Sequence, residues 1–162
     1  MSSDAVNIEQ LQEMRQQHIG RLLQQAFRGF NHRAIAKLRQ RGHSGLTLAH
    51  TLLLSHLDLE GTRITVLAER AGITKQSMGQ LVLDLEKRGY IERKVDPLDH
   101  RATLVLFTSM GWQFLHDAYE IKREIEAEYQ AILGEEGMKQ LRVALTRLLE
   151  QADSQELEAP PT

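Results

Sequence analysis

Residues 63–108 read RITVLAERAGITKQSMGQLVLDLEKRGYIERKVDPLDHRATLVLFT, which predicts two short helices joined by a tight turn and followed by a two-stranded hairpin. Thr65 is a candidate N-cap of the first helix, because a threonine side chain accepts a hydrogen bond from the first free amides. Gly72 is expected to end that helix, since glycine tolerates the left-handed backbone that such a stop needs. Ile73 is expected to be the buried residue of the turn.

The second helix is predicted to begin after Thr74, which can cap it, and to end at Gly89. The spacing of Ala68, Gly72 and Met78 is typical of a helix-turn-helix, with a close crossing, a turn and an apolar contact. Helical spacing predicts an inner apolar stripe of Met78, Leu81, Val82 and Leu85. On these two helices alone, an ordinary helical hairpin with a solvated outer face is the alternative.

The outer face of the second helix is predicted to be polar or small, and to hold Lys75, Gln76, Ser77, Gly79, Gln80 and Asp84. A helix with such a face can lie in the DNA major groove and read base edges. Lys75 would lie at the N-terminal end of this helix, where a basic side chain can contact a phosphate.

Two alternating stretches, 90–96 and 102–107, predict the strands of the hairpin, with Ile91 and Val95 facing inward. The intervening residues 96–101, Asp-Pro-Leu-Asp-His-Arg, are expected to form the turn, because aspartate and proline suit its first two positions. The result is a wing, a projecting loop whose basic side chains are Arg93, Lys94, His100 and Arg101. A wing beside a recognition helix can place an arginine in the minor groove, where the negative potential favours it.

These features together resemble the MarR family of bacterial winged-helix regulators, through LAERAGITKQSMGQLVLDLEKRGYIER (67–93), DPLDHR (96–101) and LVLFTSMG (104–111). The family's wing usually reads Asp-Pro-x-Asp-Arg-Arg, and the strand after it ends Leu-Thr-x-x-Gly. The chain keeps that pattern at Asp96, Pro97, Asp99, Arg101, Thr108 and Gly111. It departs from it at Phe107, a conservative change, and at His100, which removes a fixed charge from the wing tip at neutral pH.

The resemblance implies a mainly α fold with a small β wing, in which long terminal dimerisation helices flank a winged helix-turn-helix core. The expected organisation is an N-terminal dimerisation helix (1–46), a DNA-binding region (47–108), C-terminal dimerisation helices (109–152) and a flexible tail (153–162). Helical periodicity itself predicts a long first helix over 8–41, a short one over 48–57 capped by Thr47, and a loop over 58–63. It also predicts a helix capped by Thr108, with Trp112 and Ile121 on one face, that stops at Gly134.

Charge is unevenly distributed along the 162 residues, although the net charge is only −2. Residues 1–46 carry +4 and residues 63–101 carry +2, whereas residues 117–162 carry −6. The acidity therefore lies away from the expected DNA-binding face. Because +2 is modest, we expect moderate affinity with a clear salt dependence, and a dimer would double the basic surface.

The expected function is that of a homodimeric, sequence-specific regulator of double-stranded DNA, a ligand-responsive repressor acting on a pseudo-palindromic operator. Ser77 and Gln80 are the expected base readers. Arg101 is expected either to enter the minor groove or to form a structural pair with Asp99. The full set of predicted DNA-binding residues is Arg63, Thr74, Lys75, Gln76, Ser77, Gly79, Gln80, Arg93, Lys94, His100 and Arg101. The alternative, prompted by the low basic charge and by His100, is a winged-helix module that binds proteins and not DNA.

Other chemistry has little support in the sequence. No nucleophile motif, phosphate-binding glycine loop or enclosed pair of acids is present, so we expect neither an enzyme nor a cofactor. The seven histidines lack zinc-ligand spacing, cysteine is absent, and no metal site is expected. Without a signal pattern or a long apolar run, a cytoplasmic location is expected. The resemblance also implies a small aromatic or anionic effector, with a predicted lining of His18, Phe27, His43, His50, Leu54 and Trp112.

Overall fold

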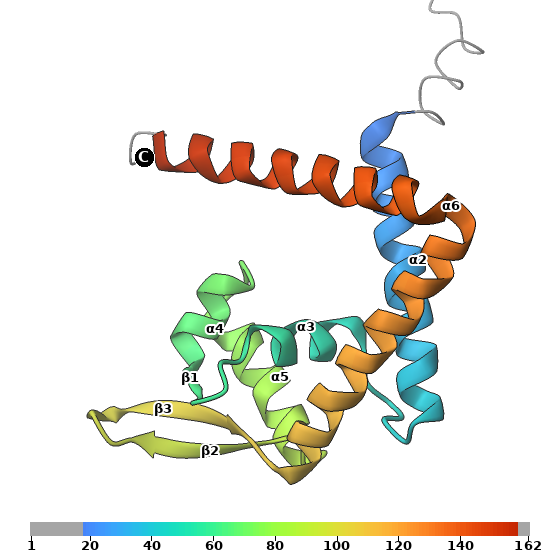
Figure 1. The fold of residues 1–162 in the computed structure, drawn as a ribbon. Coiled ribbons are helices and arrows are strands. Elements are labelled where there is room, and N and C mark those ends of the chain that lie inside the picture. Colours follow the sequence, from blue (N-terminus) through green and yellow to red (C-terminus); the bar gives the residue numbers. More distant parts are fainter. Residues whose placement is uncertain (1–17, 159–162) are drawn as a thin grey trace, which may run out of the picture. The chain divides into compact units, whose positions relative to one another are not determined.

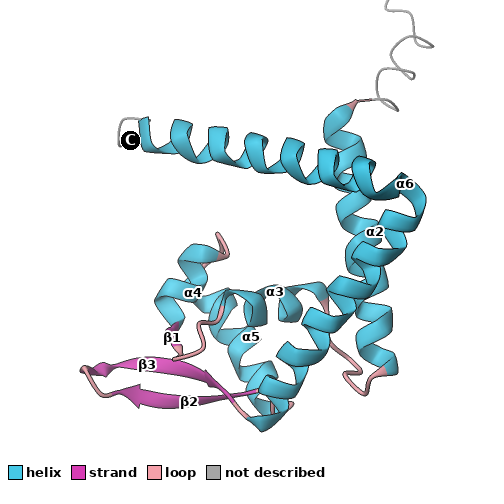
Figure 2. Cartoon of the chain, in the orientation of Figure 1, coloured by secondary structure: helices cyan, strands magenta, loops and turns pink. Residues whose placement is uncertain are grey.

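The computed structural model describes the backbone of residues 18–158 and the side chains up to residue 151. Its elements are α2 (Ile19–Gln40), α3 (Leu48–His56), β1 (Thr62–Arg63), α4 (Ile64–Arg70), α5 (Lys75–Lys87), β2 (Ile91–Asp96), β3 (Asp99–Phe107) and α6 (Ser109–Glu158) (Figure 1). Helices dominate and the strands form one small antiparallel sheet (Figure 2), so the predicted fold class is confirmed. Within the described residues, no helix has both the length and the apolar character needed to cross a bilayer.

The chain forms two compact units that divide within α6, one ending at Ile121 and the other beginning at Lys122. The core of the first unit lies where α3, α4, α5 and the sheet meet. Its most deeply buried side chains are Leu53, Leu54, Leu67, Met78, Val82, Leu85, Ile91 and Val105. Three members of the apolar stripe predicted for the second motif helix belong to this group, while Leu81 is half-buried.

The start of the helix-turn-helix differs from the prediction. Thr62 and Arg63 form a short strand that pairs with Val105 and Leu104 of β3, so the loop expected over 58–63 is shorter. The strand leads directly into α4, which places Arg63 at the N-cap position without a side-chain cap. Thr65 is therefore inside the first turn and the prediction that it caps the helix is wrong.

The turn between α4 and α5 follows the prediction in its backbone but not in its side chain. Gly72 has φ +63°, the left-handed conformation expected at the helix stop. Ile73, however, is 39% exposed, so its predicted burial is wrong. Leu67, Ala68 and Met78 already fill the inner side of the helix pair, and only the backbone amide of Ile73 bonds inward, to the carbonyl of Ala68.

The hairpin is tighter and less covered than predicted. Asp96 pairs with Asp99, so only Pro97 and Leu98 lie between the strands, and the predicted six-residue turn is wrong. Val95, predicted to face inward, is 61% exposed. The turn end of the hairpin projects past α4 and α5 (Figure 1), and among the described residues of this unit no helix covers it, so alternation no longer selects a buried side.

The first turns of α6 pack tightly against the end of α5. Thr108 caps the helix as predicted, accepting a hydrogen bond from the amide of Gly111. A Cβ on Gly111 would lie 2.1 Å from the carbonyl oxygen of Tyr90, so only glycine fits there. Ile121 is buried as predicted, but Trp112 is 45% exposed and lies against the ring of Phe107 instead.

The terminal helices stop where the sequence predicts near Gly42 and Gly134, but their lengths differ from the prediction. The described part of the first helix runs unbroken through Gly29 to Gln40, and its predicted beginning at residues 8–17 lies outside the described residues. In the second unit the helix is interrupted at Gly134, which has φ +73° as a stop requires. The helix after it continues to Glu158, past residue 153 where the flexible tail was expected to begin.

Candidate nucleic-acid interface

The N-terminal half of α5 presents a polar surface to solvent. The Thr74 Oγ1 accepts a hydrogen bond from the Ser77 amide at 3.1 Å and donates one to the Ser77 Oγ at 2.9 Å. This cap fixes the first turn and leaves the Ser77 hydroxyl hydrogen free to donate. The exposed side chains of this surface are Thr74, Lys75, Gln76, Ser77 and Gln80, and Gly79 is half-buried among them. The predicted outward face is thus present, apart from Asp84.

Asp84 holds the back of α5 to α3. Its carboxylate lies 2.9 Å from Nε2 of His50 and accepts a hydrogen bond from the Nε of Arg88 at 3.1 Å. The Nδ1 of His50 accepts a hydrogen bond from the Thr47 amide, so Nε2 carries the proton of a neutral ring. Burial lowers the pKa of His50, and the nearby Asp84 opposes that shift only in part.

The wing is anchored by a buried carboxylate. Asp96 accepts a hydrogen bond from the Nε of Arg63 at 2.6 Å and another from the backbone amide of Leu98 at 2.8 Å. The Leu98 bond is the main reason that the pKa of Asp96 is lowered, and Arg63 adds to it against the effect of burial. Arg63 also lies 3.8 Å from Asp99. Arg63, which was predicted to contact a phosphate, is therefore paired with two carboxylates of the wing.

Two more of the predicted basic contacts are paired with acids. Arg93 binds Glu86 on α5 through its guanidinium and its amide, and these bonds lower the pKa of Glu86. Lys94 lies 2.7 Å from Glu92. Motif spacing does not predict either pair, because Arg93 meets Glu86 only once β2 lies against α5, and the partner of Lys94 is on its own strand.

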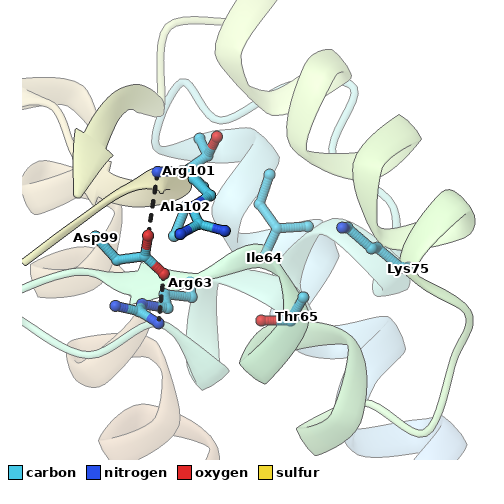
Figure 3. Close-up of a pocket in the computed structure, with 8 residues that line it drawn as sticks. Arg63, Ile64, Thr65, Lys75, Asp99, Arg101 and Ala102 are labelled. Carbon is cyan, nitrogen blue, oxygen red and sulfur yellow. Dashed lines mark hydrogen bonds and ion pairs between the residues drawn. The ribbon is translucent and has the colours of Figure 1, made fainter.

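Arg101 and Lys75 differ, because neither side chain forms an ion pair within the part of the chain that the structure describes. Both line a cleft of about 290 Å³ between the starts of α4 and α5 and the strand β3 (Figure 3). Only the amide of Arg101 bonds Asp99, so the side-chain pair considered from the sequence is not formed. The lining residues are Arg63, Ile64, Thr65, Lys75, Asp99, Arg101, Ala102 and Thr103.

A buried polar cluster that the sequence does not reveal joins α6 to the end of α5. His43 lies 2.9 Å from Asp117 through Nε2 and 3.1 Å from the Tyr90 hydroxyl through Nδ1. Because a carboxylate only accepts, Nε2–H donates to Asp117 and Tyr90 donates to Nδ1. Burial raises the pKa of Asp117, but hydrogen bonds from His43 and neighbouring side chains outweigh it and lower the pKa overall. Phe114 packs edge-on against both rings.

The six predicted effector-binding residues do not line the cleft beside Lys75 and Arg101. Nor do they line a second cleft, of about 280 Å³, beside Arg93. His43 and His50 are held by the hydrogen bonds above, and Leu54 is a core residue. His18 and Phe27 are exposed on α2, where His18 caps the helix through Nδ1. The effector site therefore stays a prediction.

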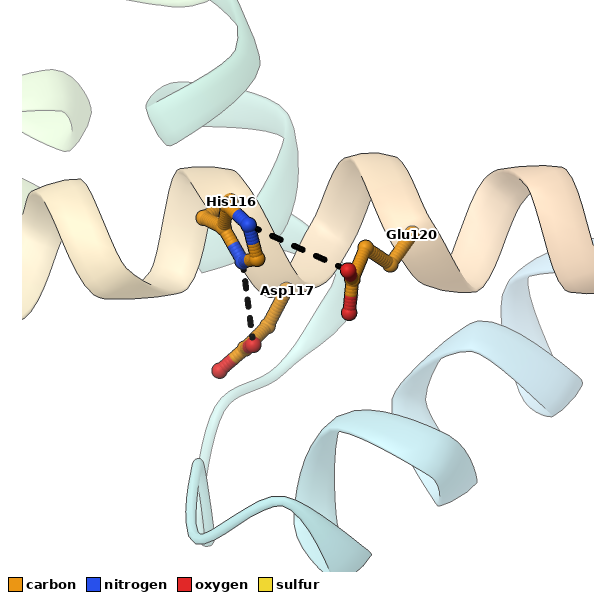
Figure 4. Close-up of side chains that lie close together, drawn as sticks. All are labelled: His116, Asp117 and Glu120. Carbon is orange, nitrogen blue, oxygen red and sulfur yellow. Dashed lines mark ion pairs between the residues drawn. The ribbon is translucent and has the colours of Figure 1, made fainter.

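One group of side chains in the described residues has metal-ligand spacing, namely His116, Asp117 and Glu120 on α6 (Figure 4). Their ligand atoms lie within 4.8 Å of one another. The Nη1 of Arg41 lies 2.7 Å from Glu120 and 3.6 Å from Asp117, so a cation already neutralises both carboxylates. Ion pairing accounts for this cluster.

The sheet, the capped polar helix and the projecting hairpin define a winged helix-turn-helix protein. The model of the MarR family matches residues 44–102. The crystal structure of MarR matches with a TM-score of 0.69 and 26% identity, covering 85% of this chain and 98% of that one. The chain is therefore similar to the MarR family of transcriptional regulators over residues 44–102 and in fold, which confirms the resemblance seen in the sequence.

Other solved structures agree in fold. A probable transcriptional regulator from Pseudomonas aeruginosa has a TM-score of 0.62 and 28% identity, over 82% of this chain and 98% of that one. An S. aureus MepR variant bound to an oligodeoxyribonucleotide has a TM-score of 0.57 and 23% identity, over 83% and 97%. No curated protein matches the sequence.

Proposed function

We propose that this chain binds double-stranded DNA as a homodimer, and represses transcription by occupying a pseudo-palindromic operator. One observation carries the proposal, namely the exposed polar face at the N-terminus of α5 beside two basic side chains, Lys75 and Arg101, that have no acidic partner among the described residues. A helix end of this kind carries partial positive charge, which favours phosphate. The oligonucleotide bound to the related MepR variant supports the same use of the fold.

The residues of this face have separable roles. Ser77 and Gln80 offer donors and acceptors to base edges, and Gly79 lets the backbone of α5 come close to the groove. Lys75 and Arg101 contribute charge directly, whereas Arg93 and Lys94 must exchange carboxylate partners for phosphates. For that reason we expect Arg93 and Lys94 to contribute less to affinity than Lys75.

Dimerisation is supported by apolar side chains that stay exposed on single helices of this chain. On α2 they are Ile19, Leu22, Leu23 and Phe27, and on the last helix they include Leu141, Leu145, Leu148 and Leu149. Exposed apolar stripes of this extent are typical of protein–protein contacts. A two-fold axis would present two α5 helices to major grooves about 34 Å apart.

The first experiment is fluorescence anisotropy of the full chain against its own upstream DNA and a scrambled duplex, at several salt concentrations. Preference for the upstream DNA with a steep salt dependence is the expected result. Gln80→Ala should reduce the preference, and Arg101→Ala should lower affinity for both duplexes. Lys139→Ala, which removes an exposed charge on the last helix, is the control for Arg101→Ala. It should change neither the affinity for DNA nor the preference for the upstream duplex.

Equal binding to both duplexes at every salt concentration, followed by an empty genome-wide DNA selection, would refute the proposal. The protein-interaction module would then be the better explanation, since Arg93 and Lys94 on the wing are paired with acids. The effector is tested separately with salicylate-like acids. An unchanged melting temperature and unchanged DNA affinity would remove that class of ligand.

A further inference from the structure

The tip of the wing carries the most exposed large apolar side chain of the described residues. Leu98 is 91% exposed, and the next such residue, Ile132, is 72% exposed. Single exposed leucines are common on protein surfaces, so exposure alone assigns no role. What sets Leu98 apart is its position in the two-residue turn between β2 and β3, at the end of the hairpin that projects from the fold (Figure 1).

Leu98 is also held in place. Its amide donates to the Asp96 carboxylate at 2.8 Å, and that carboxylate accepts from Arg63 on β1 at 2.6 Å. The turn is therefore connected to the strand that precedes the helix-turn-helix. Because its backbone is ordered before any partner arrives, a contact made by Leu98 loses little conformational entropy.

The charges around the tip suit nucleic acid. Asp96 is 5% exposed and bonded to Arg63, and Asp99 lies half-buried beside the same guanidinium. His100 and Arg101 follow directly and are exposed, and Arg101 has no acidic partner in the described part of the chain. An apolar tip with a basic neighbour matches the floor and walls of a minor groove, where sugars are apolar and phosphates flank them.

We propose that Leu98 is a specificity-determining residue that enters the minor groove and selects A·T over G·C at the base pair under the wing tip. The proposal rests on the DNA-binding function above. In the minor groove a G·C pair differs from an A·T pair by the guanine 2-amino group, a hydrogen-bond donor. An isobutyl group pressed against that donor removes its water and returns no acceptor, which is unfavourable.

Inosine isolates this effect, because an I·C pair lacks the 2-amino group but keeps the major-groove edge of G·C. The operator is first obtained by selection with the full chain, and the wing-contacted pairs are located by hydroxyl-radical footprinting. At those pairs, replacing A·T by G·C should weaken binding about tenfold, and I·C should restore most of it. The ratio of the dissociation constants for G·C and I·C is the quantity that reports on Leu98.

Three variants test whether the side chain of Leu98 causes the ratio of the G·C and I·C dissociation constants. Leu98→Ala should bring it to about two, and Leu98→Gln should lower it further because its amide oxygen accepts from the 2-amino group. Val95→Ala, an equally conservative change at an exposed apolar residue of the same hairpin, should leave it near ten. Circular dichroism of each variant checks that the fold is kept.

A wild-type ratio near one, or a ratio that Leu98→Ala leaves unchanged, would overturn this inference while DNA binding itself stands. A shift of oligomeric state in Leu98→Ala, measured by analytical ultracentrifugation, would overturn it in favour of a protein contact. A chain that selects no DNA sequence would overturn both this inference and the proposed function.

Discussion

Single residues decide how closely the elements of this fold approach. The seam between α6 and the end of α5 depends on Gly111, where the nearest backbone oxygen leaves no room for a Cβ. The sequence indicates this glycine only through the family pattern, because its partner Tyr90 is 21 positions earlier. Glycines that punctuate helices are easier to predict, since their role depends on local backbone alone.

Gly111→Ala is expected to destabilise the protein by about 2–3 kcal/mol, because the new methyl group forces the seam apart. Urea denaturation followed by circular dichroism measures the change. Gly29→Ala is the matched control, since a Cβ there meets nothing within 4 Å and alanine favours a helix. An unchanged or raised midpoint for Gly111→Ala would contradict the described packing.

His50 makes stability depend on pH. Its folded-state pKa is lowered, mainly by burial, so the unfolded chain takes up the proton first. The free energy of unfolding should therefore fall as the pH drops below roughly 6.5, the ordinary value for histidine. Protonation also removes the acceptor that His50 offers to the amide of Thr47.

His50→Gln should reduce the loss of stability between about pH 7.5 and pH 5.5, as measured by chemical denaturation at each pH. His32→Gln, a change at an exposed histidine on α2, is the control and should leave that loss as it is. If the two variants show the same pH dependence as the unchanged protein, His50 is not responsible for it.

Elements were predictable where local chemistry sets them. Thr47, Thr74 and Thr108 cap their helices as the sequence indicates, and the glycine stops at 72 and 134 have the expected left-handed backbone. The predictions that Thr65 caps its helix and that Ile73 and Val95 face inward were wrong, because β1 and the projecting hairpin depend on tertiary pairing. The polar face of α5 was predictable in the same local way.

The partners within the interface were not predictable, because Arg63 and Asp96 lie 33 positions apart and meet only in the folded sheet. Asp96→Asn should loosen the wing, since the amide is a weaker acceptor for both the guanidinium and the Leu98 amide. Hydrogen exchange at Leu98 should speed up while exchange within α5 stays unchanged. Equal exchange at Leu98 in both proteins would show that the carboxylate does not anchor the turn.

At the scale of the whole molecule, DNA affinity should depend on self-association. Phe27→Glu and Leu148→Glu each place a charge in an exposed apolar stripe, and each should shift the protein toward monomer in analytical ultracentrifugation. Binding to a two-half-site duplex should weaken at least tenfold, while binding to a single half-site changes little. Arg147→Glu, a charge reversal on the last helix, is the control for added negative charge.

The cluster of His43, Tyr90 and Asp117 has a mechanical consequence. Its three side chains come from the loop after α2, from the residue that leads from α5 to β2, and from α6. If one segment slid against the others, buried donors and acceptors would lose their partners, and each loss would cost about 1–3 kcal/mol of stability. The end of α5 and the first turns of α6 therefore move together as one rigid body. In the proposed dimer, any change in the angle between the two copies would therefore change the distance between their two α5 helices.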